Sequence, residues 1–221
     1  MTSTMRTAQR TIVYVDGFNL FYGALKGRGP GHKWLDLRAL SRRLLPENNI
    51  VQIRYFTARV SARPHDPGIP ERQQAYLRAL STLADVTVHH GEFKVSYPWM
   101  AVFDPTAPPD QLPKKVQVIK TEEKGSDVNI GSYLILDACR GRCEVAVVIT
   151  NDSDLTEPVR LAREELGIAV GVVNPHETAR RSRSLQGTFF RQLRRNTVRQ
   201  CQFPEVLEDA AGRPVHRPAG W

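Results

Sequence analysis

Three parts of the 221-residue chain place aspartates at the end of an apolar, strand-like stretch or at the start of a helix-like one, a pattern that suits metal-dependent chemistry. Asp16 follows TIVYV, Asp127 lies in KGSDVN, and Asp152 and Asp154 follow VAVVIT. Carboxylate ligands without a convincing set of Cys or His residues favour Mg2+ or Mn2+ over Zn2+. Such a cation lowers the pKa of a bound water and neutralises charge on a phosphate during in-line attack. The acids therefore favour phosphodiester chemistry.

Each of these aspartates also has a purely structural interpretation. Asp16 suits the N-cap of a following helix, and Asp127 suits a first helical turn capped by the preceding serine. Asp154 and Glu157 form a D-x-x-E capping-box pattern. The combination favours a site, because carboxylates gathered at one edge repel one another unless a cation or a raised pKa relieves them.

Aspartates this far apart in the sequence can meet only if the fold brings their segments together. The order of strand-like and helix-like stretches predicts a sheet that does so. Apolar, β-branched stretches typical of strands occupy residues 11–15, 50–56, 86–90, 116–119, 145–150 and 168–173. Stretches with helical spacing begin at Leu35, Glu71, Asp127 and Leu155. This alternation predicts a largely parallel sheet with helices on both faces. Ligands of such sheets bind beyond the carboxyl ends of the strands, where the aspartates stand.

Composition narrows the functional classes. No stretch approaches the ~20 apolar residues of a membrane helix, and the N-terminus lacks the apolar core of a signal peptide. We therefore expect a cytoplasmic protein that does not enter a membrane. Cys139, Cys143 and Cys201 lack the partners of a zinc site and are interpreted as reduced thiols. The net charge of +8 favours a polyanionic partner.

Three stretches together resemble a known family. VDGFNLFY, KGSDVNIGSYLILDA and VVITNDSDLTEPVRLAREELGIAVGVV are similar, in this order, to motifs of the NYN domain, a branch of the PIN-like ribonuclease superfamily. The resemblance implies a Rossmann-like, three-layer α/β/α sandwich with a mainly parallel central sheet. It also implies that Asp16, Asp127 and Asp152 bind Mg2+ or Mn2+, with Asn19 and Asp154 completing the catalytic set. TND in place of the frequent SGD is a mild departure that keeps both acids.

The resemblance implies a metal-dependent endoribonuclease. One alternative is a non-catalytic RNA-binding or regulatory NYN-domain protein. Another is a phosphohydrolase, which the absence of a glycine-rich phosphate loop from the sequence makes less favoured. Either Glu122 or Glu123, which precede the K-G-S-D motif, is a candidate to orient a ligand or a water.

Basic residues predict how single-stranded or structured RNA would be held. Arg side chains suit phosphate oxygens and stack on bases. Phe189 and Phe190 offer faces to bases, although packing against the domain is the favoured interpretation. The candidate RNA-binding residues are Lys124, Arg180, Arg181, Arg183, Arg191, Arg194 and Arg195.

Residues 1–202 are expected to form one NYN/PIN-like nuclease domain. Within it, a proline-rich insertion around residues 95–115 is expected to form a long loop or a hairpin-like excursion. An Arg-rich segment, residues 178–200, is expected to be helical. Residues 203–221, rich in proline, glycine and charge, are expected to be a loosely ordered tail. Assembly as a homo-oligomer is compatible with the sequence.

Overall fold

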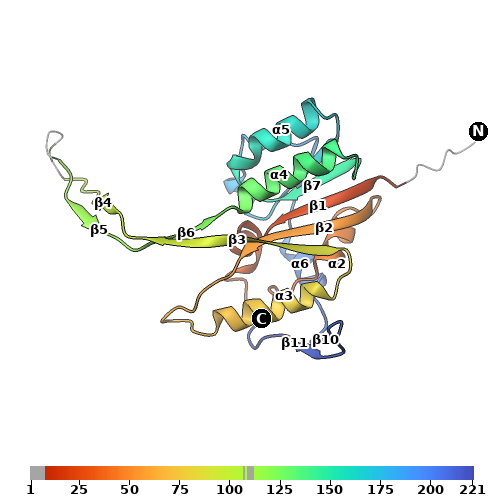
Figure 1. Cartoon of the computed structure of the whole chain (residues 1–221), viewed down its shortest axis with the longest axis horizontal. Helices are drawn as coiled ribbons and strands as arrows, with labels where there is room; N and C mark the ends of the chain where they lie inside the picture. The colour runs from red at the N-terminus through yellow and green to blue at the C-terminus, as the bar shows by residue number, and fades with distance from the viewer. Residues whose placement is uncertain (1–7, 107, 109–111) are drawn as a thin grey trace, which may run out of the picture.

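The computed structural model describes residues 8–106, 108 and 112–221 and is built around a seven-stranded sheet (Figure 1). The strand order is β6-β3-β2-β1-β7-β8-β9, and every neighbouring pair is parallel except β3 and β6. The predicted mainly parallel sheet is therefore confirmed. The strands are β1 (Arg10–Asp16), β2 (Asn49–Ala58), β3 (Val86–Ser96), β6 (Lys120–Lys124), β7 (Val145–Ile149), β8 (Ala169–Asn174) and β9 (Phe189–Gln192).

Helices cover both faces of the sheet, because alternate side chains of the central strands point to opposite sides. In β1, Val13 and Val15 belong to one buried cluster, whereas Ile12 and Tyr14 belong to another. The first cluster is covered by α1 (Gly17–Leu20), α2 (Leu37–Leu44), α3 (Ile69–Ser81) and α6 (Arg195–Gln200). The second is covered by α4 (Ser126–Cys139) and α5 (Thr156–Glu164). Among the described residues, none of the helices has the length and apolar character needed to cross a membrane.

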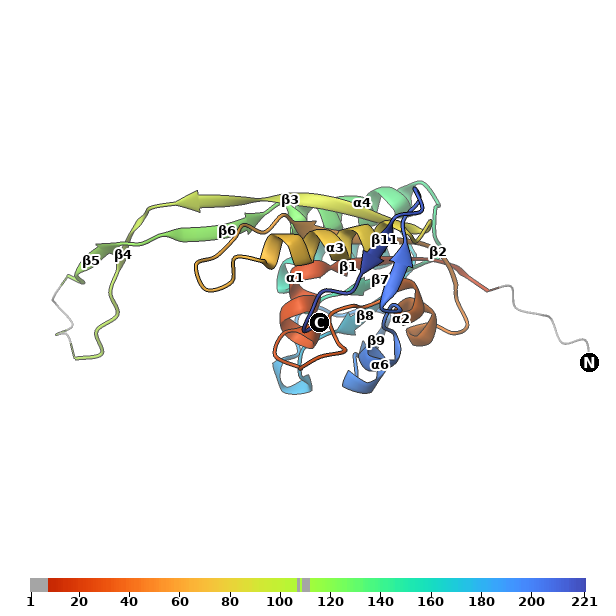
Figure 2. The ribbon, with the colours of Figure 1, turned by 90° about the horizontal axis from the view of Figure 1, so that it is seen from below.

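The proline-rich insertion forms a hairpin-like excursion (Figure 2). Strand β3 leaves the body, continues into β4 (Trp99–Ala101), and the chain returns through β5 (Lys115–Gln117) and β6, with antiparallel pairing throughout. We call the outer part of this excursion, residues 95–106, 108 and 112–119, the arm. The strand expected at residues 116–119 is wrong in its bounds, since pairing stops at Gln117 and resumes at Lys120.

The sequence pattern predicted a helix over the Arg-rich segment, residues 178–200, and this prediction is wrong for most of its length. The segment contains a short 3-10 turn (Thr178–Arg180), then β9, and only afterwards α6. Phe189 and Phe190 are adjacent in a strand, so they pack against the two opposite core clusters. Pairing with β8 is what makes this segment a strand.

The C-terminal segment is more ordered than its composition predicted. β10 (Val206–Glu208) and β11 (Pro214–His216) form an antiparallel hairpin, and Phe203 and Val215 are buried. The ring of Trp221 lies 6.1 Å from that of Tyr76 and 6.5 Å from that of Trp34, measured between ring centres. Aromatic packing across the first face of the sheet therefore holds the end of the chain in place.

Candidate metal centre

The structure brings together three of the aspartates selected from the sequence. Asp16, Asp127 and Asp152 each offer a carboxylate oxygen, and these oxygens lie within 4.8 Å of one another. Asp16 ends β1, and Asp152 follows β7 by three residues. Because β1 and β7 are neighbouring parallel strands, their carboxyl ends meet at one edge of the sheet. Asp16 and Asp152 are thus positioned by the ends of neighbouring parallel strands, as the sequence predicted.

Asp127 is positioned by an antiparallel strand and the helix that follows it. The strand before it, β6, runs antiparallel to β3 and returns from the excursion toward the carboxyl edge of the sheet. Gly125 then turns the chain with a φ of 101°, a left-handed conformation that favours glycine. Helix α4 starts at the next residue, and Asp127 lies in its first turn. An outgoing and returning pair of strands therefore replaces the expected parallel strand.

Thr150 joins two of the acids and was not singled out from the sequence. Its hydroxyl donates to Asp16 Oδ2 at 2.9 Å and accepts from the backbone N–H of Asp152 at 3.1 Å. Asp16 Oδ1 accepts from the backbone N–H of Asn19 at 2.9 Å. Both oxygens of Asp16 are thus held in fixed directions. The available signal was the Thr of TND, a hydroxyl residue two positions before an acid.

The acidic cluster carries an electrostatic cost. Burial, together with the charges of Asp127 and Asp152, raises the pKa of Asp16 to about 6 despite the hydrogen bonds from Asn19 and Thr150. Burial also raises the pKa of Asp127 to about 6, with contributions from Asp152, Glu123 and Asp154. Close carboxylates that are costly to ionise are relieved by a cation. An all-oxygen donor set of this kind fits a hard divalent ion.

The side-chain amide of Asn19 links two of the segments that carry the acids. Its side-chain oxygen accepts from the backbone N–H of Asn151 at 2.9 Å, which ties the start of α1 to the turn after β7. This hydrogen bond helps to hold the turn that carries Asp152.

Asp154 lies outside the group of three but close enough for its charge to raise the pKa of Asp127. The capping box expected from Asp154 and Glu157 is not formed. Asp152 is the cap instead, since its Oδ1 accepts from the backbone N–H of Asp154 at 3.0 Å. Glu157 pairs with Arg160 on the surface of α5. Asp152 therefore both caps the 3-10 turn Ser153–Leu155 and belongs to the acidic cluster.

Glu123, and not Glu122, faces the cluster. Successive residues of a strand point to opposite sides, so only one of the two can do so. Glu123 Oε1 accepts from Ser126 Oγ at 2.9 Å and its charge raises the pKa of Asp127. Glu122 pairs with Lys120 and Lys124. Of the two glutamates, Glu123 is therefore the one that lies beside Asp127.

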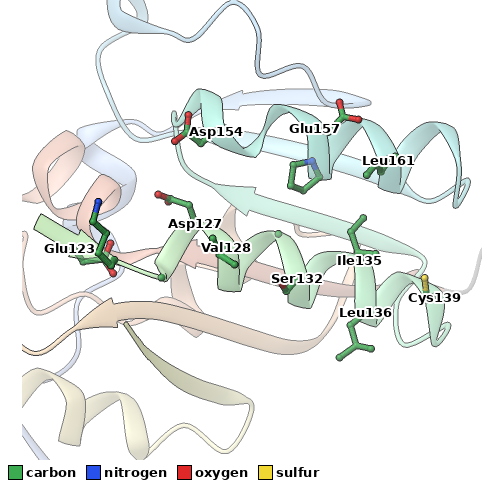
Figure 3. Close-up of a pocket in the computed structure, with 14 residues that line it drawn as sticks. Glu123, Asp127, Val128, Ser132, Ile135, Leu136, Cys139, Asp154, Glu157 and Leu161 are labelled. Carbon is green, nitrogen blue, oxygen red and sulfur yellow. The ribbon is translucent and has the colours of Figure 1, made fainter. Parts of the chain in front are cut away.

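A groove of about 850 Å³ begins at the acidic cluster and runs between α4 and α5 (Figure 3). Asp127 and Asp154 lie at one end and Cys139 at the other. Its middle is lined by aliphatic side chains, among them Val128, Ile135, Leu136 and Leu161. We call it the helix groove.

The basic residues proposed from the sequence do not form a single patch. Arg181 and Arg183 line a cleft of about 720 Å³ that also includes Phe190, and the guanidinium of Arg181 lies 3.5 Å from the Phe190 ring centre. Arg194 and Arg195 line a second cleft of about 510 Å³. Both clefts include Thr178, so they adjoin. The remaining three lie elsewhere: Arg180 in the 3-10 turn, Arg191 in β9 and Lys124 on the helix groove.

Asn151 connects the first of these clefts to the acidic cluster. Its Nδ2 donates to the backbone oxygen of Arg180 at 2.7 Å, and its Oδ1 accepts from the backbone N–H of Ser182 at 2.7 Å. Since Asn151 directly precedes Asp152, the Arg-bearing loop is fastened to the same turn as the acids. Sequence reasoning named the arginines but missed this connection.

Comparisons with known proteins give three findings. A model of the NYN domain family matches residues 10–193. The chain is 31% identical over 239 residues to 6-hydroxy-3-succinoylpyridine 3-monooxygenase HspA of Pseudomonas putida, and the alignment covers 96% of this chain and 75% of that protein. It is also similar to the crystal structure of a protein of unknown function from Vibrio parahaemolyticus, with a TM-score of 0.52, 17% identity, and coverage of 88% of this chain and 97% of the other. At that identity the likeness concerns the fold alone.

Proposed function

The chain belongs to the NYN domain family, and on that premise we propose that it is a metal-dependent endoribonuclease with a PIN-like fold. The observation that carries the proposal is the meeting of Asp16, Asp127 and Asp152 at the carboxyl edge of the sheet. These three come from three separate elements and gather despite their mutual repulsion, which is the expected arrangement of a cation site.

Asp16, Asp127 and Asp152 are the residues that would hold Mg2+ or Mn2+. A bound divalent ion supplies a water of lowered pKa and neutralises the charge that develops on a phosphodiester under attack. Thr150 and Asn19 fix the direction of both Asp16 oxygens through the hydrogen bonds described above. A preorganised cluster of this kind avoids a rearrangement at the moment of reaction.

A polynucleotide is the favoured substrate because cationic side chains stand beside the acids. The Arg180–Ser182 loop is held by Asn151, one residue from Asp152. Arg forks bind phosphate oxygens in pairs and stack on aromatic faces, as Arg181 does on Phe190. We propose that Arg181 and Arg183 contact the phosphates of single-stranded or structured RNA in the adjoining clefts. Arg180, Arg191, Arg194, Arg195 and Lys124 extend the positive field around this path.

The test is incubation of the purified chain with end-labelled single-stranded RNA, with Mn2+ or with EDTA. Internal cleavage with Mn2+ and none with EDTA is expected, and Asp152→Asn should abolish it. Glu144→Gln is the matched control, because Glu144 directly precedes β7, at the opposite edge of the sheet, and pairs with Arg10. Cleavage that survives Asp152→Asn would contradict the assignment. Single-stranded DNA in a parallel incubation measures the preference for RNA.

The non-catalytic alternative predicts a different outcome of the same experiment. An RNA-binding or regulatory protein would retard labelled RNA in a gel while leaving it intact. Calorimetry must then show that Mn2+ binds under those conditions. Intact RNA in the presence of a bound ion would favour this alternative.

A second catalytic function is favoured by the relative from Pseudomonas putida, whose name describes a monooxygenase acting on a hydroxypyridine. The helix groove, aliphatic in its middle and acidic at one end, has room for an aromatic ring. A monooxygenase places one atom of O2 in its substrate and reduces the other to water with two electrons from a reductant. Consumption of O2 that depends both on 6-hydroxy-3-succinoylpyridine and on an added reductant would favour this function over RNA cleavage.

A further inference from the structure

The arm exposes an unusual amount of apolar surface. Of the fourteen exposed large hydrophobic side chains among the described residues, nine lie on the arm. They include Tyr97, Trp99, Phe103, Leu112 and Ile119, and Phe103 is 87% exposed. Contiguous exposed apolar patches of this kind mark interaction sites.

Among the described residues, the arm projects beyond the sheet and the helices that cover it. Both views show a two-stranded ribbon that projects away from the sheet and its helices (Figures 1 and 2). An isolated two-stranded ribbon is marginally stable in water and needs a hydrophobic partner. Strands β4 and β5 form a sheet of their own, apart from the seven-stranded one.

The helix groove is complementary to the arm in character. Two more of the fourteen exposed hydrophobic side chains, Val128 and Leu136, belong to this groove, and Val128 is 72% exposed. Its acidic end carries Asp127 and Asp154. The arm combines apolar side chains with exposed lysines, Lys114 and Lys115. Apolar surface thus matches apolar surface, and positive charge matches negative charge.

The arm of a chain points away from the groove of the same chain. Helix α4 runs from the base of the excursion across the body, whereas the arm extends in the opposite direction (Figure 1). The arm that fills a groove must therefore come from another molecule. Each copy carries one arm and one groove, so two copies related by a two-fold axis make two identical contacts and form a closed assembly.

We infer that the protein forms a symmetric dimer in which the arm of each copy docks into the helix groove of the other. Leu112, Ile119 and Met100 favour this partner over a nucleic acid, because aliphatic side chains offer no face on which a base can stack. The docked arm ends at the acidic cluster, so assembly would shape the entrance to that cluster. The inference does not depend on the reaction that the cluster performs.

The first test measures the mass of the full chain by light scattering during gel filtration. Twice the 24.9 kDa of one chain is expected. Trp99→Ser with Phe103→Ser on the arm, or Val128→Lys in the groove, should each weaken the dimer at least about tenfold, since aromatic anchors dominate such interfaces. Val206→Ser is the control, because this exposed hydrophobic residue lies on β10 and should leave the dimer intact.

Mixing separates an arm–groove contact from an arm–arm contact. The arm variant retains a normal groove, and the groove variant retains a normal arm, so a mixed pair keeps one intact contact. Dimer mass should partly return when the two variants are combined. Dimers of the groove variant as tight as those of the wild type would overturn the inference.

Cys139 supplies a second readout that does not depend on mutating the interface. It is exposed at one end of the groove, whereas Cys143 and Cys201 are buried. Cysteines placed in turn on the arm, by Val102→Cys, Thr106→Cys and Gln117→Cys, should give dimers with a bis-maleimide. At least one product should disappear when Cys139→Ser is added. The inference is overturned if the wild-type chain is a monomer, or if no product requires Cys139. Loss of RNA binding by the arm variant of a monomeric chain would instead assign the arm to a nucleic acid.

Discussion

Asp16 and Thr150 lie at the carboxyl ends of neighbouring strands, and the Thr150 hydroxyl donates to Asp16 Oδ2 at 2.9 Å. The same hydroxyl oxygen accepts from the backbone N–H of Asp152. One buried side chain therefore fixes the orientation of one acid and the backbone position of another. Partners of this kind govern metal affinity without touching the metal.

Thr150→Val tests this role, because valine keeps the shape of threonine and removes its hydroxyl. The loss removes the hydrogen bond to Asp16 Oδ2 and leaves only that from Asn19 to Oδ1, so Mn2+ binding should weaken by roughly 10-fold to 100-fold. Calorimetric titration with Mn2+ measures the change. Thr150→Ser restores the hydroxyl and should recover most of the affinity, which separates loss of the hydrogen bond from a change in packing.

The pH dependence of Mn2+ binding follows from the two raised pKa values. In the metal-free chain, Asp16 and Asp127 each have a pKa of about 6, so protons compete with the cation below that pH. Affinity should fall steeply between pH 6 and pH 5, by up to about tenfold per pH unit for each group, and change little above pH 7. Titrations at pH 5, 6, 7 and 8 measure this. Affinity that is flat from pH 5 to pH 8 would contradict it.

The core strands and the acids at their ends were predictable because local sequence determines them. TIVYV and VAVVIT lack polar alternation, and β1 and β7 are indeed buried along nearly their whole length. An acid directly after such a strand must stand at the edge of the sheet, so Asp16 and Asp152 could be placed from their neighbours alone.

The elements that were missed depend on partners distant in the sequence. β6 reads KTEEK and carries no apolar pattern, because an exposed edge strand is held by pairing with β3. β9 is a strand because it pairs with β8, within a segment whose arginines suggested a helix. Trp221 packs on Trp34, and nothing local in the last residues indicates that contact.

Asp127→Asn should stabilise the metal-free chain at neutral pH. Burial and neighbouring acids raise the pKa of Asp127 above its ordinary value, so ionising this group costs more in the folded chain than in the unfolded one. The wild-type chain is therefore most stable with respect to this group below about pH 4, where Asp127 is protonated in both the folded and the unfolded chain. It loses that stability as pH rises through about 6, whereas the asparagine of the variant never ionises. At pH 7.5 the variant should therefore melt higher than the wild type by on the order of 2 °C.

Thermal unfolding in EDTA measures this difference, and the sign should reverse when saturating Mn2+ stabilises the wild type more than the variant. Near pH 4 the two chains should melt at similar temperatures, since Asp127 is then protonated. A variant less stable than the wild type at pH 7.5 without metal would show that Asp127 serves the fold rather than the site.

Arg181→Ala tests whether the loop held by Asn151 binds phosphates. The guanidinium of Arg181 lies over Phe190 in a cleft lined by the loop that Asn151 holds, where it can form paired hydrogen bonds to a phosphate. Its removal should weaken RNA binding similarly for all sequences. It should also reduce the slope of the logarithm of the binding constant against the logarithm of the salt concentration by about 1. Arg140→Ala is the control, because Arg140 is exposed just after α4. Mn2+ affinity should stay unchanged in both variants, since neither residue belongs to the acidic cluster. An unchanged salt slope in Arg181→Ala would place the RNA path elsewhere on the surface.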